Sequence, residues 1–135
     1  MKIMIVEDDV TSSKLLQRIL SPHGDCTICI DGEEAVHAFR LAWDEGAPYD
    51  LICMDIMMPN MDGKQALLLI REHEREMGIN EADRAKVVMV TAVDDSATVL
   101  DSFYRCGATS YIVKPITKGK LMEVIGWDRV EPAAV

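Results

Sequence analysis

The segment LICMDIMMPNMDG, residues 51–63, opens with four apolar residues that run directly into an aspartate, Asp55. A second apolar run, residues 3–6, ends in the same way at the acidic residues 7–9, EDD. A carboxylate at the end of a buried strand is costly unless another group compensates its charge. Two such strand ends in one small domain therefore predict a shared cation site, in which one of the acids can also act as a nucleophile.

Length and composition indicate a single globular domain. The chain has 135 residues, enough for one domain with its own core and too few for two. Its net charge of −9 argues against direct binding to nucleic acid or to an anionic membrane, and suits a divalent cation or a basic protein surface. No apolar run approaches the ~18 residues of a membrane span. The first strand pattern begins at Lys2, which leaves no room for a signal peptide, so we expect a cytoplasmic protein.

The four cysteines have a structural interpretation. Cys26 and Cys29 form a C-x-x-C pattern, but they lie in a strand-like run in which residues three apart point to opposite faces. That geometry fits neither a disulfide nor a shared metal. Together with Cys53 and Cys106, they are expected to be buried or half-buried thiols of a reducing compartment.

Short apolar runs alternate with helical patterns along the chain. The apolar runs occupy residues 2–6, 26–30, 51–54, 87–90 and 110–113. The helical patterns occupy residues 10–20, 31–43, 62 to about 78, 94 or 95 to 107, and about 118–127. Continuous apolar runs are typical of parallel strands buried on both faces. We therefore predict an α/β protein of the flavodoxin-like, doubly wound (βα)5 type, with five parallel strands in the order 2-1-3-4-5 and helices on both faces.

Several local features refine this prediction. Asp31, Asp62 and either Asp94 or Asp95 are the predicted helix N-caps, whereas Gly78 and Gly107 mark predicted helix ends. Phe39 and Trp43 are expected in the core. The stretch 76–86 is predicted to be a polar connection.

The predicted strand order brings the polar strand ends together. In such a sheet the ligand crevice lies at the carboxyl ends of the first and third strands. That edge offers Glu7, Asp8, Asp55, Thr91 and Lys114. Crowded carboxylates repel one another unless a cation intervenes, and an oxygen-rich site favours Mg²⁺, with Mn²⁺ as an alternative. A carboxylate, a divalent cation, a lysine and a hydroxyl together can place and neutralise a phosphoryl group on an attacking carboxylate oxygen.

Four segments sharpen this interpretation: VEDD (residues 6–9), MDIMMPNMDG (54–63), VTA (90–92) and YIVKP (111–115). The order and spacing of these segments resemble those of the receiver domains of response regulators, the CheY-like family of two-component signalling. The resemblance covers residues 1–127. Residues 128–135 are expected to form a C-terminal tail or the stub of a linker.

The resemblance implies a role for each acid of the site. Asp55 would be the phosphoacceptor, and Asp8 would bind Mg²⁺ directly. Glu7 would help mostly through water. The backbone carbonyl of Met57 would complete the metal shell.

It also implies roles for residues of the last two strands. Thr91 would hydrogen-bond the phosphoryl group, and Lys114 would pair with it. Tyr111 would be the switch aromatic that turns inward when Thr91 moves. The Lys114–Pro115 peptide bond is expected to be cis.

By the same resemblance, the function would be a phosphorylation-driven switch. A sensor histidine kinase or a histidine phosphotransfer protein would supply the phosphoryl group. The fourth helix, fifth strand and fifth helix, roughly residues 95–127, would bind a downstream protein, with no direct nucleic-acid or membrane binding by this domain. The domain would be a monomer or a phosphorylation-dependent dimer. It would catalyse its own modification without being a turnover enzyme.

Rival functions fit the sequence less well. A phosphohydrolase of the haloacid-dehalogenase type needs an acid two residues after the nucleophile, where this chain has Met57. A flavodoxin-like FMN carrier needs a phosphate loop after the first strand, where residues 7–9 are acidic. A phosphorylation-independent pseudo-receiver is the main alternative, and the presence of Asp8, Asp55, Thr91 and Lys114 argues against it.

Other polar residues have simpler interpretations. Asp9 is predicted to be a helix N-cap, and Met57, Met58 and Met61 are predicted to be packing and loop residues. Solvated side chains are predicted for His23, His37, His73, Glu72, Glu74 and Glu76. Because Met57 and Val93 are apolar where a polar side chain could orient a hydrolytic water, we expect slow loss of the phosphoryl group.

Overall fold

The structure, a computed structural model, describes residues 1–92, 97, 101 and 105–126. Its strands form one sheet in the order β2-β1-β3-β4-β5. The strands are β1 (Lys2–Val6), β2 (Asp25–Cys29), β3 (Leu51–Asp55), β4 (Lys86–Thr91) and β5 (Ser110–Val113). All neighbouring strands pair in parallel, which confirms the predicted flavodoxin-like topology.

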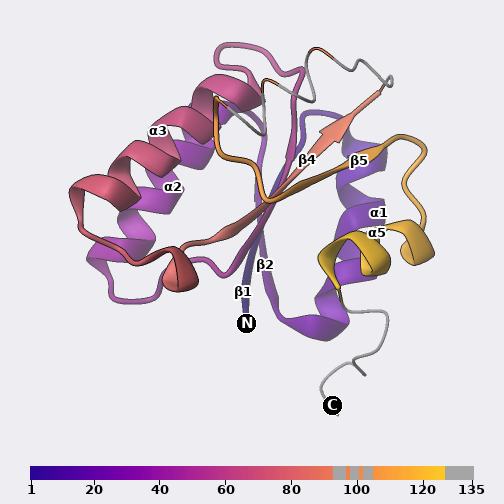
Figure 1. Cartoon of the computed structure of the whole chain (residues 1–135). Helices are drawn as coiled ribbons and strands as arrows, with labels where there is room; N and C mark the ends of the chain where they lie inside the picture. Colours follow the sequence, from indigo (N-terminus) through magenta and orange to yellow (C-terminus); the bar gives the residue numbers. More distant parts are fainter. Residues whose placement is uncertain (93–96, 98–100, 102–104, 127–135) are drawn as a thin grey trace.

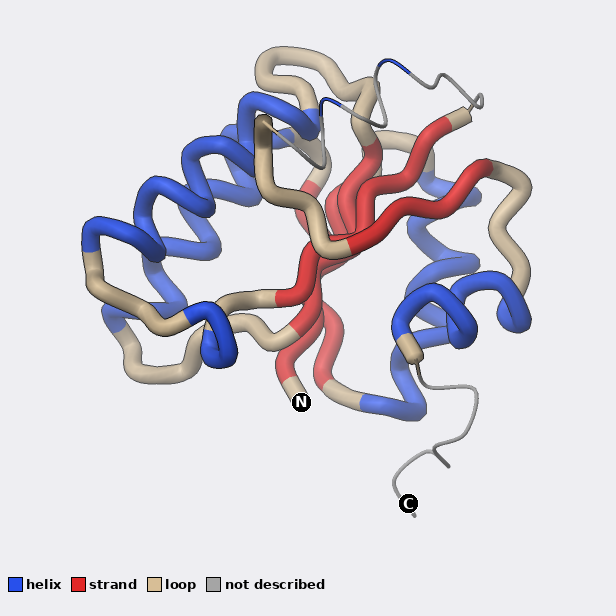
Figure 2. Tube along the Cα trace, viewed as in Figure 1, coloured by secondary structure: helices blue, strands red, loops and turns tan. Residues whose placement is uncertain are grey.

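Helices cover both faces of this sheet. The described helices are α1 (Val10–Leu20), α2 (Gly32–Asp44), α3 (Gly63–Glu76) and α5 (Lys118–Ile125), with short 3₁₀ turns η1 (Ser21–His23) and η2 (Glu81–Asp83). Figure 1 shows α2 and α3 on one face and α1 and α5 on the other, and Figure 2 shows the strands in the middle layer. Within the described ranges, no helix has the length and apolar character needed to cross a membrane.

The helix starts follow from side-chain capping. Asp9, Asp31 and Asp62 each accept a hydrogen bond from a backbone N–H in the first turn of α1, α2 and α3, respectively. At α3 the bond is reciprocal, because the Gln65 side chain accepts from the Asp62 N–H. The predicted caps are therefore confirmed at all three positions, and each fixes where the loop after a strand ends.

Part of the predicted fourth helix lies outside the described residues, including its suggested caps Asp94 and Asp95. At its end, the Arg105 and Cys106 N–H groups donate to the Asp101 carbonyl oxygen. Gly107 has a φ of 84°, a left-handed conformation that suits a helix end. The predicted last turn at Trp127 and the predicted tail, residues 128–135, also lie outside the described residues.

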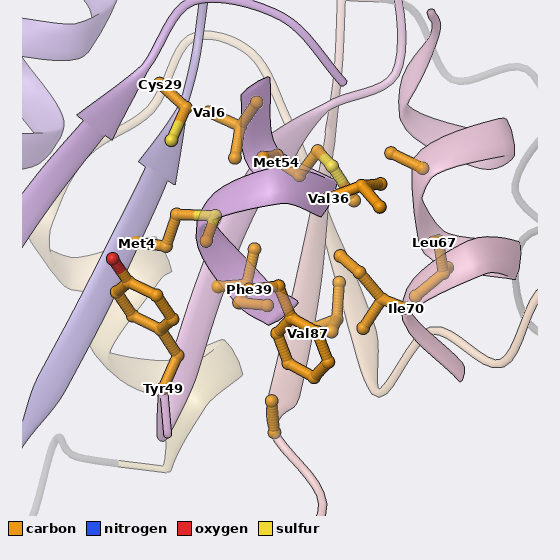
Figure 3. Packing of buried hydrophobic residues seen from close by; sticks show 14 of the residues in the cluster. Met4, Val6, Cys29, Val36, Phe39, Tyr49, Met54, Leu67, Ile70 and Val87 are labelled. Atoms are coloured by element: carbon orange, nitrogen blue, oxygen red, sulfur yellow. The ribbon is translucent and has the colours of Figure 1, made fainter. Parts of the chain in front are cut away.

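The core divides into two layers because successive residues of a strand point to opposite faces. On β1, Met4 and Val6 pack toward α2 and α3, whereas Ile3 and Ile5 pack toward α1 and α5. Figure 3 shows Phe39 among residues of the first layer, and its side chain is fully buried. Cys29 belongs to the first layer and Cys26 packs against the second, which confirms that their side chains point apart.

Two predictions of burial need correction. All five strands were predicted to be buried on both faces, but the edge strands β2 and β5 are only partly buried, because each has a neighbouring strand on one side alone. Ile30 was predicted to end the second strand, but it lies beyond the end of β2 and 58 % of its surface is exposed. Trp43 is half-buried rather than in the core. The predicted polar connection, residues 76–86, contains the short turn η2. Within it, the Arg84 Nε donates a hydrogen bond to the Ile79 carbonyl oxygen at 3.1 Å.

Candidate functional site

Three acids converge where β1 and β3 end. Val6 pairs with Met54 across the two strands, so the next residues along each strand, Glu7 and Asp55, emerge side by side. One carboxylate oxygen from each of Glu7, Asp8 and Asp55 lies within 4.8 Å of the others. Glu7 and Asp55 are buried, with 2 % and 6 % of their surfaces exposed, whereas Asp8 is exposed. The predicted meeting of the acids is thus present in the fold.

One lysine faces both buried acids. The Lys114 Nζ lies 3.3 Å from the Glu7 Oε2 and 3.3 Å from the Asp55 Oδ2. The other oxygen of Asp55, Oδ1, accepts a hydrogen bond from the Met57 N–H at 3.1 Å. The two oxygens of Asp55 are therefore oriented by different groups, and the carboxylate is held in one position.

Strand pairing places Thr91 beside Lys114. Thr91 is the last residue of β4, pairs with Val113 and accepts a backbone hydrogen bond from Lys114 at 2.7 Å. Thr91 is buried, and the Lys114–Pro115 peptide bond that follows is cis. Tyr111, earlier on β5, has 37 % of its surface exposed. The site thus spans the carboxyl ends of β1, β3, β4 and β5.

The loop after Asp55 is held in place by close contacts at Gly63 and by contacts with the start of α2. Gly63 has no room for a Cβ, which would press against the Asp55 carbonyl oxygen. Gly32, at the start of α2, is packed in the same way against the Met61 carbonyl and donates its N–H there. The Asn60 side-chain amide donates to the Asp31 carboxylate at 2.9 Å. These contacts fix the loop that carries the Met57 backbone.

Sequence reasoning missed the Asn60–Asp31 contact. Asp31 was predicted only as a helix cap, which it is, and its second oxygen was left without a role. Asn60 has a φ of 65°, a conformation that asparagine tolerates better than most residues. The PN pair in the loop could have predicted this turn, but not the partner 29 residues away in sequence.

The crowding of the acids changes the pKa of Glu7. Burial and a hydrogen bond with Asp55 raise the pKa of Glu7 from 4.5 to about 7, although the Asp9 N–H and the Lys114 charge act in the opposite direction. Burial alone would lower the pKa of Lys114, but the negative charges and hydrogen bonds of Asp55 and Glu7 outweigh it and raise that pKa. Burial is therefore the main reason that the charged form of Glu7 is disfavoured, and Lys114 offsets this effect only in part.

The residues fit a hard divalent cation. All three acids offer oxygen ligands, the donor type that Mg²⁺ and Mn²⁺ prefer. The buried Glu7 Oε2 accepts no well-formed hydrogen bond from the described residues, although the Lys114 ammonium lies near it. A cation here would satisfy that oxygen and reduce the repulsion between the acids.

A pH dependence follows for the metal-free protein. Between pH about 4.5 and about 7, Glu7 holds a proton in the folded state that it loses in the unfolded chain. The folded state binds more protons, so the free energy of unfolding falls as pH rises through this window, by about 3 kcal/mol for this group. Urea unfolding in EDTA at several pH values measures this fall. We expect Glu7→Gln to remove most of it, and an unchanged slope in that variant would contradict the assignment.

Most of the simpler interpretations are confirmed, with three corrections, of which the first is that His23 is half-buried rather than solvated. Asp9 caps α1, and the Cys29 and Cys53 thiols are buried, which raises each pKa to about 12. Glu74 was predicted to be solvated but is fully buried, because its face of α3 packs on the start of β4. His73 was also predicted to be solvated but is half-buried, with its ring edge-on to Phe39 at 5.9 Å.

The three methionines after Asp55 are packing and loop residues, as predicted. Met58 and Met61 are partly buried against the core layer that contains Phe39. Met57 is 75 % exposed, so its side chain contributes little to packing. An exposed apolar side chain two residues after Asp55 is therefore present at the mouth of the site.

Known proteins with a similar sequence share this fold. The family described as "Response regulator receiver domain" matches residues 3–126. The chemotaxis protein CheY of Treponema pallidum is 33 % identical over 126 residues, which cover 92 % of this chain and 79 % of CheY. The chain also matches much longer curated relatives, among them histidine kinases, and spans 7 to 24 % of the length of three of them.

Solved structures of receiver domains are also similar to this chain. The CheX–CheY–BeF₃–Mg²⁺ complex from Borrelia burgdorferi contains a chain with 29 % identity and a TM-score of 0.77, covering 96 % of this chain and 90 % of that one. A complex from Saccharomyces cerevisiae joins the phosphotransfer protein Ypd1 to the receiver domain of Ssk1. Its match has 27 % identity and a TM-score of 0.79, and covers 94 % of this chain and 88 % of that one.

Proposed function

Because the chain belongs to the response regulator receiver domain family of two-component signalling, we propose that it is a phosphorylation-activated switch whose phosphoacceptor is Asp55. The observation that supports this proposal is the convergence of three carboxylates and one lysine at the ends of β1, β3 and β5. A pseudo-receiver would not need two buried acids held beside a lysine at a cost in stability. No feature of the described residues favours that alternative.

The side chains suit phosphoryl transfer. An oxygen of Asp55 would form a new bond to phosphorus as the bond between phosphorus and the donor breaks, and the donor would leave with its bonding electrons. The Lys114 ammonium, already 3.3 Å from the Asp55 Oδ2, would pair with the added charge. The buried Thr91 hydroxyl would donate a hydrogen bond to it. Tyr111 would respond to movement of Thr91.

A divalent cation would complete the site. Asp8 and Asp55 would bind Mg²⁺ directly, Glu7 would act mostly through water, and the Met57 carbonyl would add a further oxygen. Mn²⁺ has the same preference for oxygen ligands and could replace it. When bound, the cation supplies positive charge that neutralises phosphoryl oxygens. The fastened loop between Asp55 and Gly63 would keep the Met57 carbonyl in position.

The partners follow from this role. A sensor histidine kinase or a phosphotransfer protein would donate the phosphoryl group, in line with the similarity to a receiver domain bound to Ypd1. The output surface would include β5 and α5, where Tyr111 is exposed, and would bind a downstream protein. We propose a cytoplasmic switch that modifies itself and turns over no separate substrate. It would act as a monomer or as a phosphorylation-dependent dimer.

The proposal is tested with acetyl phosphate. The protein is incubated with acetyl phosphate and either Mg²⁺ or EDTA, and its intact mass is then measured. We expect one phosphoryl adduct with Mg²⁺ and none with EDTA. Absence of the adduct in Mg²⁺, together with absence of beryllofluoride binding, would support the pseudo-receiver instead.

The exposed Met57 predicts a long-lived phosphoryl group. An apolar side chain at this position cannot orient the water that hydrolyses the acyl phosphate, whereas an amide could. We expect Met57→Asn to speed dephosphorylation by about tenfold, measured as the decay of the adduct after removal of acetyl phosphate. Val93→Glu, at a position outside the described residues, is expected to act in the same direction.

Met77→Asn provides the control, because Met77 is also an exposed methionine but lies at the far end of α3. Its adduct should decay at the rate of the unmodified chain. A rapid decay in the unmodified chain that Met57→Asn leaves unchanged would contradict the explanation.

A further inference from the structure

A cavity of about 430 Å³ lies at the amino-terminal end of β4, and four of its lining residues are basic: Arg71, Arg75, Arg84 and Lys86. Lys86 is the first residue of β4 and Thr91 the last, so the cavity and the acid site lie at opposite edges of the sheet, about 16 Å apart along the strand. The whole chain has only 14 basic residues against 23 acidic ones. A cluster of four around one cavity is therefore a marked local reversal of charge.

Arg71 forms a rigid wall of this cavity. Its side chain is buried, and the Nε donates to the Gly107 carbonyl at 2.9 Å. The Nη1 donates to Glu74 at 2.6 Å and to the Ala85 carbonyl at 2.8 Å. Among the described residues, the Nη2 has one partner, the Thr109 Oγ1, at the long distance of 3.4 Å. A guanidinium has five N–H donors, so Arg71 keeps donor capacity while its orientation is fixed.

The other three basic residues of the cavity have fewer partners than Arg71. In the described part of the chain, Arg75, Arg84 and Lys86 form no ion pair. Glu81 is the one acid in the cavity wall, and the charge of Arg71 is matched by Glu74. The cavity wall thus carries three cations and one acid besides the Arg71–Glu74 pair, while Asp50 and Asp83 line a neighbouring pocket with Arg84 and Lys86, and Glu72 lines another with Arg75. Mutual repulsion among these cations would be relieved by a bound anion.

We propose that this cavity binds a small molecule with a multiply charged phosphate group, of the class of a nucleotide or pyrophosphate. Arginine side chains match the geometry of phosphate oxygens with paired N–H donors, and two rim arginines and a lysine offer such donors around one space. The volume is in the range of small-molecule pockets. The site would act independently of Asp55, whose own edge of the sheet is acidic and repels such an anion. Ligand binding here would clamp α3, η2 and the segment before β5 together.

The test measures binding of pyrophosphate and of ADP to the full chain by calorimetry, at low salt and with EDTA so that no divalent cation occupies the acid site. We expect one site per chain, an affinity that falls with added salt, and full binding by Asp55→Asn. Chemical shifts of the Gly107 and Thr109 amides should move while that of Asp55 does not. Binding of ADP without pyrophosphate, or of neither compound, would overturn the proposal.

Two matched double variants distinguish binding in this cavity from non-specific attraction to positive charge. Arg75→Gln with Lys86→Gln removes two exposed rim cations, whereas Lys14→Gln with Arg18→Gln removes the same residue types from the exposed surface of α1. Both pairs lower the net charge by two. The first pair is expected to weaken binding by about tenfold or more, and the second by less than about twofold. Equal weakening by both pairs would overturn the proposal.

Discussion

An Asp55→Asn variant is expected to remain folded and to take up no phosphoryl group from acetyl phosphate. An amide oxygen is a much weaker nucleophile than a carboxylate, and the substitution keeps the shape of the side chain and its hydrogen bond with the Met57 N–H. It also removes a negative charge and a hydrogen bond that raise the pKa of Glu7. We therefore expect complete loss of the adduct by intact mass, together with a shallower fall in metal-free stability as pH rises.

Asp44→Asn is the matched control, because Asp44 is exposed at the end of α2 and the change in charge is the same. This control should take up the phosphoryl group normally. Peptide mapping that places the hydroxylamine-sensitive adduct of the unmodified chain on a residue other than Asp55 would show that Asp55 is not the acceptor.

A Glu74→Ala variant is expected to lose about 3–5 kcal/mol of stability, the usual cost of breaking a buried ion pair by removing one partner. Glu74 is fully buried, accepts from the Arg71 Nη1 at 2.6 Å and accepts from the Ala85 N–H at 2.9 Å. Its removal leaves Arg71 buried with an uncompensated charge and the Ala85 N–H without an acceptor. The midpoint of urea unfolding measures the loss.

Glu72→Ala gives the comparison, because Glu72 is an exposed acid on the same helix two residues earlier. Its effect is expected to stay within about 0.5 kcal/mol. Replacing both Arg71 and Glu74 by methionine should recover part of the loss, since no buried charge then remains unpaired. A Glu74→Ala loss no larger than that of Glu72→Ala would mean that the pair contributes nothing to folding.

The inner strands could be predicted well from the sequence, for a physical reason. β1, β3 and β4 are buried on both faces, so their apolar runs are continuous and end sharply at Glu7, Asp55 and Thr91. The order of strands and helices then determines which ends meet. The acid site follows from local sequence combined with a common topology.

Long-range contacts could not be predicted in this way. Glu74 lies among acidic residues of α3 and looks solvated, but in the fold it accepts hydrogen bonds from Arg71 and from the Ala85 N–H just before β4. His73, on the same helix, also looks solvated, but its ring forms a T-shaped contact with Phe39 of α2. The Asn60–Asp31 bond joins two loops that touch only after the sheet has formed. Each depends on tertiary packing that local periodicity does not contain.

The position of β5 at the edge of the sheet has a consequence for motion. Asp55 belongs to β3, which has a partner strand on both sides and every residue buried, so its amide hydrogens should exchange with solvent only when the whole domain opens. Tyr111 belongs to β5, which pairs with β4 alone and is partly exposed. Local opening at this edge requires less free energy than opening of the centre. A modification at Asp55 would therefore attach to the least mobile strands, while the response would occur where the sheet opens most easily.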